Sequence, residues 1–304
     1  MECGYISPSG IGGGIDLRAT IESGQTFIWN REGGDMFREQ ASPNPWYSVA
    51  LPHTATHTDE AEVVRVRERD NGLEWESTTD ATLLLARLLR LTDNLNAIER
   101  AIATDNLRKR AFDAYHGLRV VRDPSFSTLI SFICSSQMRV ERIHQMQQLL
   151  AEEFGSKVEF NGATYNAYPT AEQLTEATED DLRSLNLGYR APYVKRTAQM
   201  VASGDGHPLD AVGLDYEDAR NELQKFVGVG DKVADCVLLF SLGYLEAVPL
   251  DTWIESVIEQ HYPACSKDSY KRTSAAIRDE FGGSLAGYAQ NYVFHYARHN
   301  TDEV

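Results

Sequence analysis

The hydrophobic pattern of the chain changes at about Asp80, and this change limits the folds that are open to it. Upstream, short alternating runs at 26–29, 46–49 and 61–66 predict strands of an antiparallel sheet. Downstream, apolar residues recur at helical spacing from Leu83 and stay helical to the end of the sequence. We therefore predict an α+β fold in which the sheet comes first and the helices follow.

The length and the first residues of the sequence add to this prediction. A chain of 304 residues corresponds to about two domains. We predict an antiparallel sheet domain with flanking helices over residues 1–102 and a helical domain over residues 103–304. No stretch approaches the roughly 20 apolar residues of a membrane span, and the start lacks the layout of a secretory signal. These features predict a cytoplasmic protein without a membrane partner.

Acidic residues dominate the charge of the chain. The 45 Asp and Glu residues against 29 Lys and Arg give a net charge of −16, which taken alone argues against a polyanionic partner. An acidic surface that is poor in Lys is typical of proteins soluble in concentrated salt, and it predicts a halophilic archaeal origin. Cys3, Cys134, Cys236 and Cys265 form no Cys-x-x-Cys pair, so we expect no thiolate metal site.

The segment 221–240 is the most informative part of the sequence. It predicts a helix, a Gly-x-Gly turn at Gly228 and Gly230, and a second helix whose first N–H groups lie near Val233. Free N–H groups at a helix start can bind an anion, and a phosphate of a nucleic-acid backbone is a natural occupant. The glycines alone fit an ordinary turn between helices better than a nucleic-acid site.

Two charged residues follow the turn. Lys232 lies at the start of an otherwise apolar helix, where desolvation and the helix dipole disfavour the ammonium form and make the neutral amine a usable nucleophile. Asp251 lies at the start of another predicted helix, which it could simply cap. Capping and catalysis can coexist, so this pair alone does not decide between them.

Seven segments in a fixed order carry a resemblance to a known family. They are 23–29, 117–124, 131–136, 187–194, 221–236, 248–251 and 286–294. Together they resemble the helix-hairpin-helix DNA glycosylases and, within them, the 8-oxoguanine DNA glycosylase family. The resemblance implies a TATA-binding-protein-like antiparallel sheet domain, followed by a helical domain of two subdomains with the active-site cleft between them.

The resemblance also implies an activity. Duplex DNA containing oxidised guanine would be the partner, and the damaged base would be flipped out of the duplex before reaction. The family's lysine matches Lys232, which would attack the sugar C1′ and leave a Schiff base that permits β-elimination of the strand. The family's aspartate matches Asp251, which would stabilise positive charge on the sugar. A nucleoid-associated monomer that requires no cofactor is expected.

The base pocket of the family can be placed on this sequence residue by residue. Gly24 matches the glycine whose carbonyl accepts the N7–H of 8-oxoguanine, a proton that guanine lacks. Phe294 and Cys236 match the pair that sandwiches the flipped base, and Gln290 matches the side chain that reads its Watson–Crick edge. Phe240 stands where the family usually has methionine.

The remaining matches concern DNA contacts. Arg142 and Arg190 match the arginines that read the orphaned cytosine, and Tyr189 matches the wedge beside it. Gln137 stands where the family carries an asparagine, so it would fill the gap left by the flipped base, and preference for cytosine need not be strict. The hairpin would bind DNA through Gly228, Gly230 and Val233, and could hold a potassium or sodium ion on the carbonyls of Gln224, Phe226 and Val229.

Two rival functions stay open at this point. A monofunctional glycosylase for alkylated bases or mismatched adenine would keep the hairpin and the aspartate but would need no lysine, so Lys232 argues against it. A non-catalytic DNA-binding hairpin protein, or a protein-interaction module, would have no reason to keep Lys232, Asp251, Gln290 and Phe294 together. We therefore expect a bifunctional DNA glycosylase and lyase.

Overall fold

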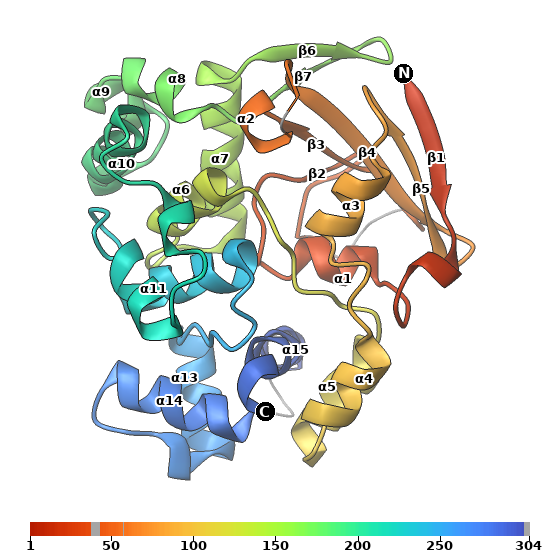
Figure 1. Cartoon of the computed structure of the whole chain (residues 1–304), viewed down its shortest axis with the longest axis vertical. Coiled ribbons are helices and arrows are strands. Elements are labelled where there is room, and N and C mark those ends of the chain that lie inside the picture. Colours follow the sequence, from red (N-terminus) through yellow and green to blue (C-terminus); the bar gives the residue numbers. More distant parts are fainter. Residues whose placement is uncertain (38–42, 57, 301–304) are drawn as a thin grey trace.

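The computed structural model describes residues 1–37, 43–56 and 58–300, and the structural statements below concern these residues. Five strands form one antiparallel sheet in the order β1-β5-β4-β3-β2 (Figure 1). The strands are β1 (Glu2–Ile6), β2 (Asn30–Arg31), β3 (Tyr47–Leu51), β4 (Glu62–Arg69) and β5 (Gly72–Ser77). The predicted antiparallel sheet is confirmed.

The tightest connection of the sheet joins β4 to β5. Asp70 and Asn71 have φ angles of 50° and 60°, which is the left-handed conformation that a two-residue hairpin turn needs at both positions. This turn sets the register, with Arg69 opposite Gly72 and Val66 opposite Trp75. Because side chains alternate along a strand, Val64 and Val66 face the same side and are both fully buried.

The strand expected over 26–29 is absent, because this segment is a buried loop and β2 begins only at Asn30. Side chains rather than a strand ladder hold the loop. Gln25 Nε2 donates to the carbonyls of Thr20 and Arg119, both at 2.7 Å, and Gln25 Oε1 accepts from Val121 N at 2.9 Å. Within the segment, the carbonyl of Phe27 accepts from Gln148 Nε2 at 3.4 Å and the carbonyl of Trp29 contacts His144 Nε2 at 2.9 Å. Side chains thus satisfy backbone groups that a strand would have paired, and alternation of apolar residues gave a wrong prediction here.

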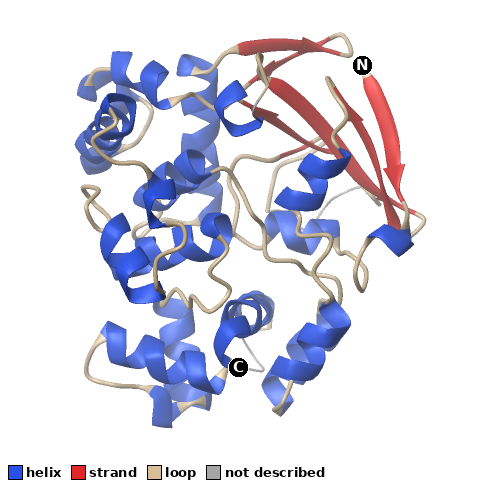
Figure 2. Ribbon diagram, viewed as in Figure 1, coloured by secondary structure: helices blue, strands red, loops and turns tan. Residues whose placement is uncertain are grey.

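Helices make up most of the rest, and Figure 2 shows the strands of the main sheet gathered on one side of the molecule. No helix in the described residues is long and apolar enough to cross a membrane. The helices are α1 (Leu17–Glu22), α2 (His53–Thr56), α3 (Thr82–Leu88), α4 (Leu95–Ile102), α5 (Asn106–Ala114), α6 (Ser125–Cys134), α7 (Val140–Phe154), α8 (Ala171–Glu176), α9 (Glu179–Ser184), α10 (Ala191–Ser203), α11 (Tyr216–Leu223), α12 (Asp231–Val237), α13 (Thr252–His261), α14 (Tyr270–Glu280) and α15 (Ala286–His299).

Shorter helical turns connect several of these helices. A π-helical turn, Leu238–Leu242, continues α12 and ends at Gly243 in a left-handed conformation. The 3₁₀ turns are Pro8–Gly10, Gly188–Arg190, Pro208–Ala211, Pro263–Cys265 and Gly283–Leu285.

A second, two-stranded sheet interrupts the helical part, which the sequence predicted to be helical throughout. Strands β6 (Lys157–Phe160) and β7 (Ala163–Asn166) pair antiparallel across Asn161 and Gly162, whose φ angles are 49° and 78°. Asn-Gly is the preferred pair for such a turn, because both residues tolerate the left-handed conformation. The local turn preference therefore prevailed over the helical pattern around it.

The last helix packs back onto helices that follow the sheet. The ring of Tyr292 on α15 stacks on Phe112 of α5 at a centroid distance of 3.7 Å, and His295 meets Tyr115 at 4.3 Å. Buried apolar side chains from the sheet, from α5 and from α15 belong to one continuous core. This packing fixes the face of α15 that lines the functional site.

Candidate active site

A cleft of about 790 Å³ collects side chains from five parts of the chain. It lies among the loop after α1, the junction of α6 and α7, helix α12 with its π turn, the start of α13, and α15. Eight residues predicted for the site line it, namely Gly24, Gln137, Lys232, Cys236, Phe240, Asp251, Gln290 and Phe294. Every predicted catalytic and base-pocket residue is thus brought together.

Lys232 lies in the first turn of α12, directly after the Gly-x-Gly turn. Its Nζ donates to Ser135 Oγ at 3.0 Å and lies 5.4 Å from the centroid of the Phe132 ring. The Ser135 hydroxyl in turn donates to the Phe132 carbonyl at 2.8 Å, so its position is fixed. The end of α6 therefore supplies a hydroxyl and an aromatic face that orient the amine.

Asp251 is the N-cap of α13, as the capping interpretation predicted. Its Oδ1 accepts from the backbone N–H of Ile254 at 2.9 Å, which fixes the orientation of the carboxylate at the cleft wall. Burial raises the pKa of this carboxyl, while the Ile254 N–H and the charges of Lys232 and Arg298 lower it in part. One side chain thus caps a helix and lines the same cleft as Lys232, whose charge acts on its carboxyl.

Two side chains give the predicted base pocket its chemical character, the uncharged thiol of Cys236 and the buried amide of Gln290. Cys236 is buried, and burial raises the pKa of its thiol to about 12, so the thiol carries no charge at neutral pH. Gln290 is 5% exposed, and its Oε1 has no hydrogen-bond partner among the described residues. A buried amide oxygen without a partner costs free energy unless a ligand binds it. Phe240 stacks on Phe132 at a centroid distance of 5.6 Å, and both rings line the cleft.

Two backbone positions at the cleft mouth take left-handed conformations. Gly24 has φ +94°, and a Cβ there would lie 3.1 Å from Cγ1 of Val140. Gln137 has φ +54°, a conformation that costs free energy for a residue with a side chain. Strained residues of this kind cluster at functional sites, and Gln137 lines the cleft.

The other predicted DNA contacts lie outside the cleft. Arg142 is exposed on α7, and Tyr189 is 57% exposed, as a wedge requires. Arg190 is buried instead. Its guanidinium donates to the carbonyl of Ser136 and lies 4.3 Å from the centroid of the Tyr189 ring. In this state Arg190 supports the turn before Gln137 rather than facing solvent.

The Gly-x-Gly turn has the predicted form. Gly228 has φ +86°, and a Cβ there would lie 2.7 Å from the Tyr193 ring. Gly230 is the N-cap of α12, and a Cβ there would meet no atom within 4 Å. Val233 is buried, so only its backbone N–H could contact a phosphate.

The cation site stays a prediction. The carbonyl of Phe226 accepts from Val229 N at 3.2 Å, while Gln224 caps α11. Over the described ranges no three His, Cys, Asp or Glu side chains are grouped so that they could hold a metal ion.

Several cleft residues were not predicted from the sequence. Phe132 and Ser135 contact Lys232, and Arg298 lies near Gly24, with its Nη1 at 3.6 Å from a Cβ placed there. Arg298 follows Phe294 by one helical turn, so the helical repeat of α15 could have placed it on the same face. No local pattern signals the contact of Ser135 with a residue 97 positions away.

Comparisons with known proteins agree with this arrangement. Residues 13–129 match the family described as 8-oxoguanine DNA glycosylase, N-terminal domain, and residues 130–281 match the HhH-GPD superfamily base excision DNA repair protein family. The chain is 31% identical to a probable N-glycosylase/DNA lyase of Methanothermobacter thermautotrophicus, over 94% of each chain. It is 38% identical to the N-glycosylase/DNA lyase of Saccharomyces cerevisiae, over 81% of this chain and 68% of the yeast protein.

A solved structure extends the similarity to the whole fold. The 8-oxoguanine glycosylase/lyase of Clostridium acetobutylicum, in complex with double-stranded DNA containing cytosine opposite 8-oxoG, superposes with a TM-score of 0.81. It is 30% identical to this chain, and the superposition covers 94% of this chain and 93% of the other.

Proposed function

The chain belongs to the 8-oxoguanine DNA glycosylase family of the HhH-GPD superfamily, and from this premise we propose how its cleft removes a damaged base. It is a base-excision repair enzyme with glycosylase and lyase activities, and double-stranded DNA is its partner. The observation that carries the proposal is that Lys232, Asp251 and Gln290 line one cleft. We propose that it acts as a monomer on 8-oxoguanine.

Recognition begins with extrusion of the base, because no side chain can reach C1′ while the base is stacked. The flipped base enters between the Cys236 thiol and the Phe294 ring. The free Oε1 of Gln290 accepts a hydrogen bond from its Watson–Crick edge, which removes the cost of leaving that oxygen unpaired. The Gly24 carbonyl accepts the N7–H of 8-oxoguanine, and guanine, which has no such proton, is rejected.

The chemical step joins the lysine to the sugar. The neutral amine of Lys232 attacks C1′, the bond from C1′ to N9 breaks, and the base leaves with the bonding electrons and gains a proton. Asp251 stabilises the positive charge that develops on the sugar during this exchange. The attached nitrogen gives its proton to the leaving base, and the C1′–O4′ bond then opens as O4′ gains a proton, which leaves a protonated Schiff base between Lys232 and C1′. This Schiff base acidifies C2′–H. Loss of that proton then expels the 3′ phosphate and cleaves the strand.

The opposite strand is held by groups around the cleft mouth. Gln137 fills the gap left by the extruded nucleotide, Tyr189 wedges beside it, and Arg142 contacts the orphaned base. Arg190 can join them only if it leaves the carbonyl of Ser136, so its contribution requires a rearrangement of this turn on DNA binding. The Gly-x-Gly turn binds the phosphate backbone through the amides at the start of α12.

Borohydride trapping on a duplex with one 8-oxoguanine tests the nucleophile. The wild type should form a covalent adduct, because borohydride reduces the Schiff base, and a duplex with guanine at the same position should give none. Lys232→Gln should give no adduct and no strand cleavage, since the amide cannot form the Schiff base. Undiminished trapping by this variant would show that another amine attacks the sugar.

The carboxylate is tested by base release in a single turnover. Asp251→Asn keeps an oxygen that can cap α13, so the fold and DNA affinity should change little. Base release should fall by about 100- to 1,000-fold, because one electrostatic contact to the transition state is lost. A near-normal rate with this variant would exclude charge stabilisation by Asp251.

A further inference from the structure

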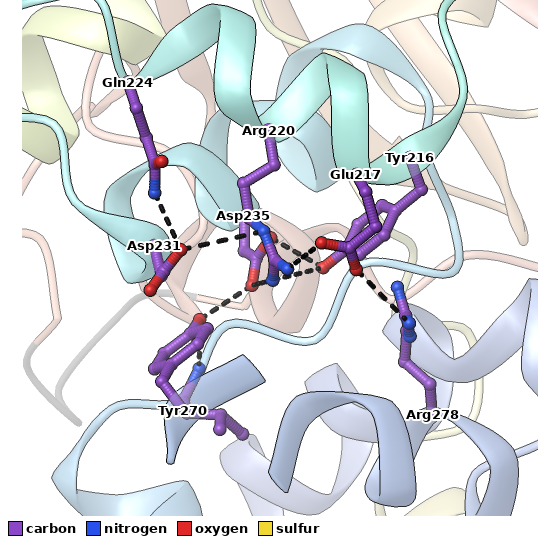
Figure 3. Close-up of polar contacts among 9 residues, drawn as sticks. Tyr216, Glu217, Arg220, Gln224, Asp231, Asp235, Tyr270 and Arg278 are labelled. Carbon is purple, nitrogen blue, oxygen red and sulfur yellow. Dashed lines mark hydrogen bonds and ion pairs between the residues drawn. The ribbon is translucent and has the colours of Figure 1, made fainter. Parts of the chain in front are cut away.

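A buried polar network joins α11, α12 and the start of α14 through residues that do not line the cleft (Figure 3). Its centre is Asp235, which is fully buried and follows Lys232 by three residues. The phenol of Tyr216 donates to Oδ1 at 2.6 Å and the phenol of Tyr270 donates to Oδ2 at 2.7 Å. Arg220 places a nitrogen 3.6 Å from Oδ2.

A second branch of the network reaches the hairpin. Arg220 Nε lies 3.7 Å from Oδ1 of Asp231, and Gln224 donates to the same oxygen at 2.7 Å. Asp231 is the first residue of α12 and Gln224 closes α11, so these contacts brace both ends of the turn.

Tyr270 connects this network to the other side of the cleft. Its phenol oxygen accepts from the backbone N–H of Leu250 at 3.1 Å while it donates to Asp235. Leu250 is buried and directly precedes Asp251. An unbroken series of hydrogen bonds therefore runs from the helix that carries Lys232, through Asp235 and Tyr270, to the segment that carries Asp251.

Stability alone does not account for a carboxylate at this position. Burial raises the pKa of Asp235 to about 6, even with two phenols and Arg220 to stabilise the charged form. Replacing buried ionic groups by apolar side chains of similar volume is often neutral or stabilising. The bond from Tyr270 differs from the bond from Tyr216 in that the Tyr270 phenol also accepts from the Leu250 N–H, so it connects the carboxylate to the segment before Asp251.

We propose that Asp235 and Tyr270 are positioning residues that hold the Asp251 carboxylate in register with the amine of Lys232. The pair contacts neither the base nor the sugar. It acts through Leu250, whose N–H fixes the backbone immediately before Asp251. This inference rests on the roles proposed above for Lys232 and Asp251.

The test compares two tyrosines that share one carboxylate. Tyr270→Phe removes the phenol that bridges Asp235 and Leu250. Tyr216→Phe is the matched control, because it removes an equivalent hydrogen bond from the other oxygen of Asp235 without touching Leu250. Single-turnover excision of 8-oxoguanine should fall by about 10- to 100-fold in Tyr270→Phe, as small misplacements near reacting groups do. Tyr216→Phe should stay within about twofold of the wild type.

A second readout separates positioning from a general loss of stability. The dissociation constant for a duplex with a reduced abasic site should be equal in the wild type and both variants. In an Asp251→Asn background, Tyr270→Phe should slow excision no further, because the group it positions is already absent. Equal rate losses in both backgrounds, or equal losses for the two tyrosines, would overturn the inference.

Failure of the inference can be told apart from failure of the proposed function. If the wild type excises 8-oxoguanine and Tyr270→Phe matches it, only the positioning role is wrong. If the wild type and Tyr216→Phe are inactive, the proposed function is wrong. Should Tyr270→Phe not fold, Asp235→Asn perturbs the same connection, because the amide keeps the shape of the side chain but has one acceptor for two phenols. Its rate loss should also vanish in the Asp251→Asn background, and persistence there would overturn the inference.

Discussion

At the scale of single residues, Asp123 shows how burial controls charge away from the chemistry. Its carboxyl accepts from the Thr26 hydroxyl, and its backbone N–H donates to the Phe240 carbonyl at 2.9 Å. Burial raises the pKa of this carboxyl to about 7, and the bond from Thr26 lowers it only in part. The side chain therefore changes charge near neutral pH while it joins the N-terminal loop to the start of α6.

The titration of Asp123 should be visible in protein stability. An aspartate in the unfolded chain titrates near pH 4, so between about pH 4 and 7 the folded state binds more protons than the unfolded state. The free energy of unfolding therefore falls as pH rises through this window. Asp123→Asn cannot titrate, so from pH 5.5 to 8 its stability relative to the wild type should rise by about 2 kcal/mol.

Urea denaturation of both proteins at the two pH values measures this difference. Asp218→Asn, a change at an exposed aspartate of α11, provides the control and should show no such trend. A constant stability difference between Asp123→Asn and the wild type would mean that Asp123 keeps an ordinary titration in the folded state.

The sequence anticipated the cleft residues to different degrees. Lys232 and Asp251 carry a chemical signal of their own at helix starts, whereas Gln290 and Phe294 were predicted only from the resemblance to the family. Ser135 could not be predicted in this way, because a serine near a helix end is common and its contact with Lys232 depends on tertiary packing. The burial of Arg190 also depends on tertiary packing, because its guanidinium donates to the carbonyl of Ser136 in another part of the chain.

At the scale of elements, the two glycines of the hairpin should respond differently to the same substitution. Gly228→Ala places a methyl group against the Tyr193 ring and forces a left-handed alanine. It should lower the free energy of unfolding by about 2 to 4 kcal/mol. Gly230→Ala meets open space at an ordinary φ of −98°, so its cost should stay below about 1 kcal/mol.

Denaturation and DNA binding together check this pair. Gly228→Ala should bind duplex DNA more weakly, because the turn that presents the N–H groups of α12 is displaced. Gly230→Ala should fold normally. A loss of affinity for duplex DNA in this variant would therefore indicate that a DNA phosphate lies directly against the added methyl group. Equal destabilisation by both substitutions would contradict the geometry of the turn.

Strand prediction failed where side-chain contacts, rather than alternation, determined the backbone. The alternating runs at 46–49 and 61–66 predicted β3 and β4, whereas the run at 26–29 is a loop whose carbonyls contact His144 and Gln148. Periodicity also missed the β6–β7 hairpin, although Asn161-Gly162 was a usable turn signal. An alternating run of four residues cannot distinguish a strand from an extended loop whose backbone N–H and C=O groups are bonded by side chains.

At the scale of the whole molecule, the net charge of −16 conflicts with a polyanionic substrate. The cleft does little to relieve this conflict, because three acidic residues offset three basic ones along its walls. The charged residues that line it are Arg139, Lys232, Arg298, Glu141, Asp251 and Glu255. We therefore expect DNA binding to depend on contacts that salt screens least, such as those proposed for the hairpin amides, for wedging by Tyr189 and for stacking on Phe294.

We accordingly predict activity that persists in molar KCl. Affinity for lesion DNA should fall with salt with a log–log slope no steeper than about −4, since each phosphate contact contributes about 0.9. Protein stability should rise over the same range, because salt screens the repulsion among the acidic groups. Binding and melting measured from low to high KCl check both trends. A protein that is most stable and most active at low salt would contradict this account of the acidic surface.

The return of α15 onto α5 has a consequence for how the enzyme is made. Synthesis proceeds from the N-terminus at about 5–20 residues per second, so α12 with Lys232 leaves the ribosome before α15 does. Gln290 and Phe294 reach their places only when α15 docks and Tyr292 stacks on Phe112. With the roles proposed above, a nascent chain would carry Lys232 before Gln290 and Phe294 could bind a base, and we expect damage-specific excision only after this helix has docked.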